Sequence, residues 1–301
     1  MISNKWEELT PLEFDEAIEK SGGLCILPLG CIERHGDHLA VGCDSFHANF
    51  VANEAAQREY AVVFPTGLWV GNVMGAHPLN EDDFKNGKFN KRGYIALSPE
   101  LLMNIMKELC SEIFRNGFRK ILIANFHGGN SAFLNYFLSS MCYENQKGAI
   151  MWTPANTIDM KEVYEIVLKE PERFSYLTDD EMKFLKKFAE TGEGGGHGDI
   201  KEVALCMYEN EKYVRPDKYE TFPYEENLTF AAQYLSDNGI IHGRSWTTNC
   251  PGAFEGYPST GCTPNIGRVL HDILSERLAA RYKFLKNDEF CVEMSQGSSF
   301  I

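Results

Sequence analysis

The sequence lacks any run of about 20 uninterrupted apolar residues, the length that a helix needs to cross a bilayer. It is also poor in basic residues, since 29 Lys and Arg stand against 43 Asp and Glu and give a net charge of -14. Such a charge repels nucleic acid and anionic lipid, because no basic surface is available to neutralise phosphate. We therefore expect neither a nucleic-acid partner nor a membrane partner.

Paired cysteines are missing as well. The nine cysteines stand singly, and no two of them form a Cys-x-x-Cys motif. This pattern favours reduced, mostly buried thiols and argues against a disulfide framework or a thiolate zinc site. The first 20 residues are amphipathic and acidic, unlike a secretory signal. These absences predict a cytoplasmic protein.

What the sequence does contain is an alternation of strands and helices. Short apolar runs predict buried strands, and apolar residues at three-to-four spacing predict helices. The alternation predicts an α/β fold with a mainly parallel sheet and helices on both faces. The expected strands are Leu24–Ile32, Ala61–Phe64, Lys120–Asn125 and Ala149–Trp152, and the expected helices include Phe46–Arg58, Pro99–Arg115 and Val269–Leu285.

The length predicts the domain organisation. With 301 residues, 44% of them apolar, the chain can bury a sizeable core, and we expect a single domain over residues 1–301. Residues 156–190 are charged and helical in pattern, and they predict a surface excursion from that domain.

Side chains that can bind metal follow two of the expected strands. Glu33 and His35 come after the first apolar run, Asp44 is expected just before the next helix, and His127 follows the third run. In open parallel sheets, ligands collect beyond the carboxyl ends of the strands. Carboxylate and imidazole ligands without thiolate fit zinc, manganese or iron. A carboxylate such as Asp44 can also bridge two ions.

Glycines accompany these side chains. Gly128 and Gly129 follow His127 and allow backbone N–H groups to approach a ligand closely. We expect Gly128, Gly129 and Asn130 to bind the substrate.

A second glycine-rich run, residues 192–199, leads into an expected helix that contains Glu202. Its flexibility predicts a loop that delivers His197 and Glu202 to the metals. A lone His or Asp is more often structural, because such groups commonly cap helices and turns. We expect this of His47 and His271. Independent turns are not expected to place four ligands beyond two buried strands, so the combination indicates a metal site.

Three motifs resemble those of the creatininase (creatinine amidohydrolase) family. The segment LPLGCIERHGDHLAVGCD is similar to that family's signature, Glu-x-His-Gly-x-His-Leu followed by Asp, and NFHGGN is similar to its Asn-x-His-Gly-Gly-Asn motif. The segment GGHGDIKEVALCMY resembles a weakened form of a third motif, His-Ala-Gly-Glu-x-Glu-Thr-Ser. The resemblance covers residues 20–285.

This resemblance implies a three-layer α/β/α sandwich, two divalent ions per chain, and a homo-oligomer, often a hexamer. Zinc is our first choice of metal, with manganese or iron as alternatives. Residue by residue, the resemblance implies that Asp44 is the bridging carboxylate and that His197 transfers protons. The metal ligands that it implies are Glu33, His35, Asp44, His127 and Glu202.

The sequence also departs from the family pattern. Creatininase proper has a glutamate ligand where this chain has Gly129, and the first glutamate of the third motif is Ile200 here. A stretch rich in proline, glycine and threonine is replaced near Lys91–Tyr94. We therefore expect a small-molecule substrate other than creatinine. Relatives in the family act on formamides of pyrimidine precursors, on peptides and on a dehydrogenated inositol ring.

The mechanism that the resemblance implies is attack of a metal-bound hydroxide on the carbonyl of a cyclic amide or other small C–N substrate, with His197 passing a proton to the leaving group. One alternative is hydrolytic C–C ring opening of a cyclic ketone, for which Asn130, Asp37 and Trp69 are candidate hydroxyl-binding residues. A non-catalytic metal-binding protein is another. A serine esterase is excluded because the sequence has no Gly-x-Ser-x-Gly motif.

Overall fold

The computed structural model describes residues 2–65, 71, 93–142, 148–192, 194–219, 234–235, 237–240, 256 and 259–287. At its centre is a sheet of four parallel strands in the order β2-β1-β3-β4. The strands are β1 (Leu24–Leu29), β2 (Val62–Val63), β3 (Lys120–Asn125) and β4 (Ala149–Pro154). This arrangement confirms the predicted α/β fold with a parallel sheet.

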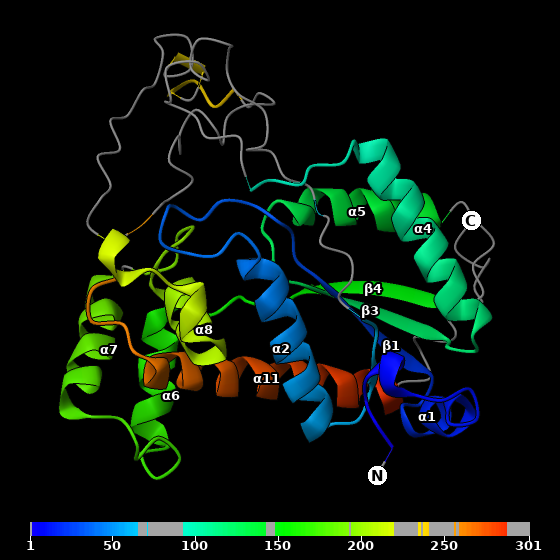
Figure 1. Ribbon diagram of the computed structural model, residues 1–301, viewed down its shortest axis with the longest axis horizontal. Coiled ribbons are helices and arrows are strands. Elements are labelled where there is room, and N and C mark those ends of the chain that lie inside the picture. Colours follow the sequence, from blue (N-terminus) through cyan, green and yellow to red (C-terminus); the bar gives the residue numbers. More distant parts are fainter. Residues whose placement is uncertain are drawn as a thin grey trace.

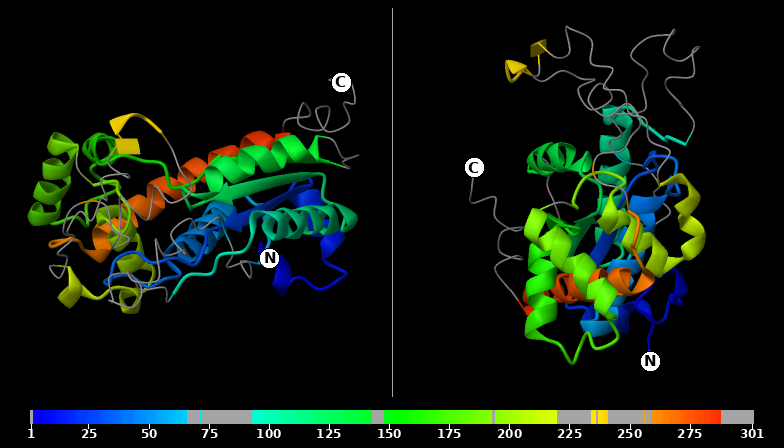
Figure 2. Two further views of the ribbon diagram at one scale, coloured as in Figure 1. Left: turned by 90° about the horizontal axis from the view of Figure 1, so that it is seen from above. Right: turned by 90° about the vertical axis from the view of Figure 1, so that its left-hand side faces the viewer.

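Helices flank the sheet on both faces (Figures 1 and 2). The α-helices are α1 (Phe14–Lys20), α2 (Cys43–Arg58), α4 (Pro99–Arg115), α5 (Asn130–Met141), α6 (Met160–Lys169), α7 (Asp179–Thr191), α8 (Ile200–Glu209) and α11 (Pro264–Asn287). Short 3-10 helices lie at Trp6–Glu8, Glu211–Tyr213 and Pro216–Lys218. None of the helices in the described ranges combines the length and the apolar character that crossing a membrane requires.

The two faces of the sheet pack into separate apolar cores. On β1, Leu24 and Ile26 belong to the core shared with α2 and α11, whereas Cys25, Leu27 and Leu29 belong to the core shared with α4 and α5. Both faces of the strand are therefore buried, which explains why its sequence is a continuous apolar run rather than an alternating one.

Element boundaries differ from the predictions at two places that matter for function. The first strand ends at Leu29 rather than Ile32, so the chain leaves the sheet before it reaches Glu33. Helix α2 begins at Cys43, three residues earlier than expected. Asp44 therefore lies inside the first turn of α2 and not before the helix, a position that favours a carboxylate because of the helix dipole.

Residues 156–190 form α6 and α7 together with the turns around them. The buried residues Val163, Val167, Leu185 and Phe188 of these helices pack into the same core as α2 and α11. In Figure 1, α6, α7 and α8 lie together at one end of the sheet. The apolar faces of α6 and α7 are thus part of the main core. A single domain over residues 1–301 stays a prediction.

Helix α11 crosses α8 at close range through Gly267. A side-chain carbon at this position would overlap the carbonyl oxygen of Ala204 on α8. We expect Gly267→Ala to lower the free energy of unfolding by about 3 kcal/mol or more, the upper end of the usual cost of overpacking. Denaturant unfolding measures this loss. Lys283→Ala, at an exposed position of the same helix, serves as the control and should stay within about 0.5 kcal/mol of the wild type. Equal stability of the two variants would contradict the close crossing.

Candidate metal centre

Four structural elements bring the predicted metal ligands together. Glu33 and His35 lie on the loop after β1, Asp44 lies in the first turn of α2, and His127 lies directly after β3. Glu202 comes from the first turn of α8. Strands β1 and β3 are parallel neighbours whose last residues, Leu29 and Asn125, pair with each other. The loops that follow them therefore begin side by side.

Gly30 permits this approach of strand and helix. A side-chain carbon at Gly30 would overlap the backbone of Asp44 and Ser45 at the start of α2. The missing side chain lets the first turn of α2 lie directly against the end of β1. This contact aims the carboxylate of Asp44 at the histidines.

One set of side chains consists of Glu33, Asp44 and His127. The Nδ1 atom of His127 is 3.1 Å from Oε1 of Glu33 and 3.2 Å from Oδ2 of Asp44. All three side chains are buried. Their carboxylate and imidazole atoms converge on a single point.

A second set consists of His35, Asp44 and Glu202. The Nε2 atom of His35 is 3.5 Å from Oδ1 of Asp44 and 3.7 Å from Oε2 of Glu202. Asp44 belongs to both sets, but through different oxygens, because Oδ2 faces His127 and Oδ1 faces His35. The two oxygens of one buried carboxylate thus face two different imidazole groups.

The distances in the second set exceed those of good hydrogen bonds, and the distances in both sets are compatible with a shared metal ion. Ligand atoms about 2.0–2.1 Å from a zinc ion at tetrahedral angles lie about 3.3–3.4 Å apart. The nitrogen–oxygen distances are slightly shorter than this in the first set and slightly longer in the second. The Nε2 atom of His35 is completely buried and has no hydrogen-bond partner among the residues that the structure describes, and a buried polar atom of this kind normally requires one. The residues present therefore fit divalent metal ions.

The charges in the centre compensate one another. Burial opposes the charged form of His35, but the carboxylates of Glu202 and Asp44 outweigh it and raise the pKa of His35 to about 10. Burial also opposes ionisation of Asp44, yet His35 and His127 hold the pKa of its carboxyl well below the usual value. The histidines therefore keep the carboxylate of Asp44 in the charged form that binds cations.

His197 lies at the edge of the centre, on the loop before α8. Its ring stacks on the ring of His35, with centroids 4.1 Å apart. Its Nδ1 atom is 3.7 Å from Oε1 of Glu33, and its Nε2 atom is 2.8 Å from the carbonyl oxygen of Arg34. The Nε2 atom of His38 lies 2.6 Å from the carbonyl oxygen of Gly198. The first and third motifs therefore hold each other in place.

The predicted substrate-binding residues have different surroundings. Gly128 is exposed, and no atom of the described residues lies within 4 Å of the place that its side chain would take. Gly129 is partly buried. Asn130 is fully buried, and its amide nitrogen donates to the carbonyl oxygen of Gly30 and to the side-chain oxygen of Asn125. Asn130 thus ties the loop after β3 to the end of β1. Substrate binding by these three residues stays a prediction.

The sequence analysis missed Cys31 as part of this centre. Its sulfur lies 2.9 Å from Oδ2 of Asp44. Its position two residues before Glu33 is the sequence feature that could have indicated it.

Among the candidates for hydroxyl binding, Asp37 has a side chain that is 58% exposed and pairs with Arg34. Trp69 lies outside the described residues.

Comparisons with known proteins agree with the motifs. A family model described as creatinine amidohydrolase, of the creatininase family, matches residues 7–282. A creatinine amidohydrolase of Pseudomonas putida is 28% identical over 127 residues, which cover 42% of this chain and 46% of that protein. The match thus spans about half the length of this curated relative.

Solved structures resemble the whole fold. A structure described as a creatininase with Mn has a TM-score of 0.61 at 18% identity, and the match covers 95% of this chain and 100% of that one. A mutant creatininase of the Zn-Zn type has a TM-score of 0.63 at 17% identity, with coverage of 96% and 100%. At these identities, the likeness shows the fold.

Proposed function

The chain belongs to the creatininase family, and we propose that it is a metal-dependent hydrolase that cleaves a C–N bond beside a carbonyl in a small molecule. The observation that carries this proposal is the placement of Asp44. Its two carboxylate oxygens face His127 in one set of side chains and His35 in another. A carboxylate in that position suits the bridge between two divalent ions.

The two sets divide the proposed ligands. Glu33 and His127 would bind one ion, and His35 and Glu202 would bind the other, with Asp44 between them. We propose zinc or manganese, because the solved relatives are described as Mn and Zn-Zn forms and both metals accept imidazole and carboxylate. When bound, such ions supply an activated water and positive charge beside the reacting carbonyl.

The remaining chemistry belongs to the protein's own side chains. His197 contacts both His35 and Glu33 at the edge of the centre, so its ring can pass a proton to the leaving nitrogen. Its contact with the carbonyl oxygen of Arg34 holds the ring in a fixed orientation. Groups placed in this way contribute about 10²–10⁴ to the rate of a hydrolysis.

Glu202 corresponds to the later glutamate of the third motif, whereas the glutamate ligand of the second motif is missing from this chain. Gly129 stands where creatininase proper has a glutamate ligand, and Glu202 reaches the same centre from α8. Gly129 therefore adds no carboxylate on the side of the loop after β3, and no atom of the described residues lies near the place that a side chain at Gly128 would take. We propose a substrate other than creatinine, either a different cyclic amide or a formamide.

A substrate screen tests the proposed function. Metal-loaded and chelator-treated protein would be compared on a panel of cyclic amides, formamides and inositol-derived ketones. We expect turnover of at least one compound with a C–N bond, lost on chelation and restored by zinc or manganese. Turnover that survives chelation would exclude a metal-dependent reaction, and turnover of the ketones alone would favour C–C hydrolysis.

Glu202→Gln tests the ligand from α8. The amide cannot supply a negative oxygen, so we expect one of the two ions to bind more weakly, as measured by metal content after dialysis. Asp199→Asn is the matched control. Asp199 caps α8 through its contact with the backbone nitrogen of Ile200, a role that asparagine also fills. Metal loss in Asp199→Asn together with retention in Glu202→Gln would shift the assignment of the third motif by three residues.

We also propose that the chain forms a homo-oligomer, as a hexamer, in the cytoplasm. Family membership is the support for this assembly. Light scattering of the purified protein would give the mass, and a monomer would contradict the proposal.

A further inference from the structure

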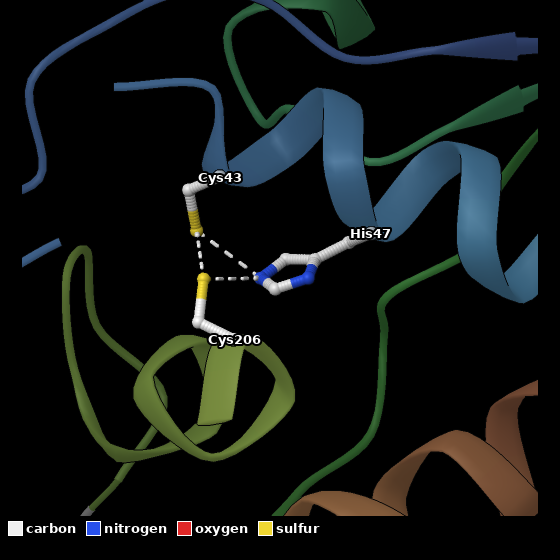
Figure 3. Close-up of side chains that lie close together, drawn as sticks. All are labelled: Cys43, His47 and Cys206. Atoms are coloured by element: carbon white, nitrogen blue, oxygen red, sulfur yellow. Dashed lines mark hydrogen bonds between the residues drawn. The ribbon is translucent and has the colours of Figure 1, made fainter. Parts of the chain in front are cut away.

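A second cluster of potential metal ligands lies next to the proposed catalytic centre, because the thiol of Cys43 also comes within 4.8 Å of ligand atoms of His35 and Glu202. It consists of Cys43 and His47, one turn apart on α2, and Cys206 on α8 (Figure 3). The two sulfur atoms are 3.7 Å apart. The Nε2 atom of His47 is 3.1 Å from the sulfur of Cys43 and 4.0 Å from that of Cys206. The three atoms form a triangle in the buried interface between the two helices.

The imidazole of His47 is held by a carboxylate on its far side. Its Nδ1 atom is 2.7 Å from Oε1 of Glu209, and the same oxygen is 3.0 Å from Nε2 of His271. A carboxylate behind a histidine fixes the ring and its tautomer, and this arrangement is typical of histidines that bind metal. The other ring nitrogen, Nε2, faces the two sulfurs.

The dimensions of the triangle match those of a zinc site. With zinc–sulfur bonds of about 2.3 Å and zinc–nitrogen bonds of about 2.0–2.1 Å, tetrahedral angles place two sulfurs about 3.8 Å apart and sulfur and nitrogen about 3.5 Å apart. The observed sulfur–sulfur distance is 3.7 Å. The two sulfur–nitrogen distances, 3.1 and 4.0 Å, lie below and above the expected sulfur–nitrogen separation.

The chemistry of the cluster also suits a thiophilic ion. Cys43 and Cys206 are completely buried, and His47 is nearly so. The interaction with Cys43, against the effect of burial, lowers the pKa of the Cys206 thiol to about 7, whereas burial raises the pKa of the Cys43 thiol well above its usual value. Thiolate with imidazole is a ligand set that selects zinc among the abundant divalent ions.

We propose that Cys43, His47 and Cys206 bind a structural zinc ion that is distinct from the catalytic metals. This ion would link α2 to α8 next to the residues that serve catalysis. Cys43 directly precedes Asp44, and Cys206 follows Glu202 by about one helical turn. The structural ion would therefore fix the two helices that present these carboxylates. The cysteine pattern in the sequence argued against a thiolate zinc site, because the two cysteines are 163 positions apart and form no short motif.

Cobalt replacement in the full chain tests the proposal, because cobalt bound to thiolate has an intense near-ultraviolet absorption that nitrogen and oxygen ligands do not produce. Because the site is buried, the protein would be expressed in cobalt-supplemented medium. We expect this absorption in the wild type and its loss in Cys206→Ser and Cys43→Ser, each checked for folding by circular dichroism. Absence of the absorption in the wild type would overturn the proposal without the need for any variant.

Three controls separate this site from the catalytic centre and from a disulfide. Cys31→Ser removes the thiol beside Asp44 and His127→Ala removes a proposed catalytic ligand, and both should keep the absorption. Cys110→Ser, a buried thiol on α4, should keep it too. Loss of the absorption in Cys31→Ser alone would assign the thiolate to the catalytic centre and contradict the proposal. Fewer than nine titratable thiols in the denatured, unreduced wild type would instead indicate a disulfide and also overturn it.

Discussion

An Asp44→Asn variant is expected to lose at least one of the two proposed catalytic ions and nearly all of its hydrolase activity. An amide presents one neutral oxygen and one nitrogen, so it cannot bridge two cations with two negative oxygens. The loss of metal affinity should exceed about 100-fold, the upper range for mutating groups that merely support a ligand. Elemental analysis of the dialysed protein measures the metal content, and turnover of the best substrate measures the activity.

The matched control for this variant is Asp37→Asn. Asp37 lies on the same loop as the first-motif ligands, but its side chain is 58% exposed and pairs with Arg34. The same chemical change there should leave metal content at the wild-type level. If Asp44→Asn kept both ions, the bridging assignment would be wrong.

A second variant, His197→Ala, distinguishes proton transfer from metal binding. We expect His197→Ala to keep its metal while kcat falls by about 10²–10⁴, the usual contribution of a general acid–base group. His197 stacks against His35 and contacts Glu33 at a distance of 3.7 Å. It belongs to neither of the two sets that share Asp44, so its removal leaves those sets intact, although its ring also lies within 4.8 Å of ligand atoms of Glu33 and His35.

His127→Ala is the comparison variant for this test. His127 lies directly after β3, and its Nδ1 atom is within 3.2 Å of both Glu33 and Asp44. Metal and activity should therefore disappear together in this variant. Metal loss of equal size in His197→Ala and His127→Ala, with activity restored by excess metal, would make His197 a ligand and remove its proton-transfer role.

Much of the fold follows from local sequence patterns. The β3 run from Lys120 to Asn125 is apolar on both faces, because it is covered by helices on both sides. Helix α4 begins at Pro99 as expected, since the side chain of Ser98 caps it by accepting from the backbone nitrogen of Leu101. The end of β1 could not be predicted, because it depends on the contact between Gly30 and the start of α2.

In the candidate site, too, some features follow from short sequence motifs and others depend on contacts between distant segments. The motifs identified Glu33, His35, Asp44 and His127, because these residues occur in short, recognisable segments at strand ends. Which oxygen of Asp44 faces which histidine depends on the packing of α2 against the sheet, and no local pattern encodes it.

The proximity of Cys43 to Cys206 depends in the same way on the packing of α2 against α8. For this reason, the sequence alone favoured unpaired structural thiols at these two positions. The helix interface, which only the three-dimensional structure describes, places their sulfur atoms together.

A crystal structure of the metal-loaded protein, with anomalous diffraction to locate each ion, tests the central claim most directly. We predict two ions in the catalytic centre, with Oδ2 of Asp44 on the ion shared with Glu33 and His127. Oδ1 of Asp44 should contact the ion shared with His35 and Glu202. Ions placed without contact to Asp44, or a single ion bound by all five side chains, would contradict the account.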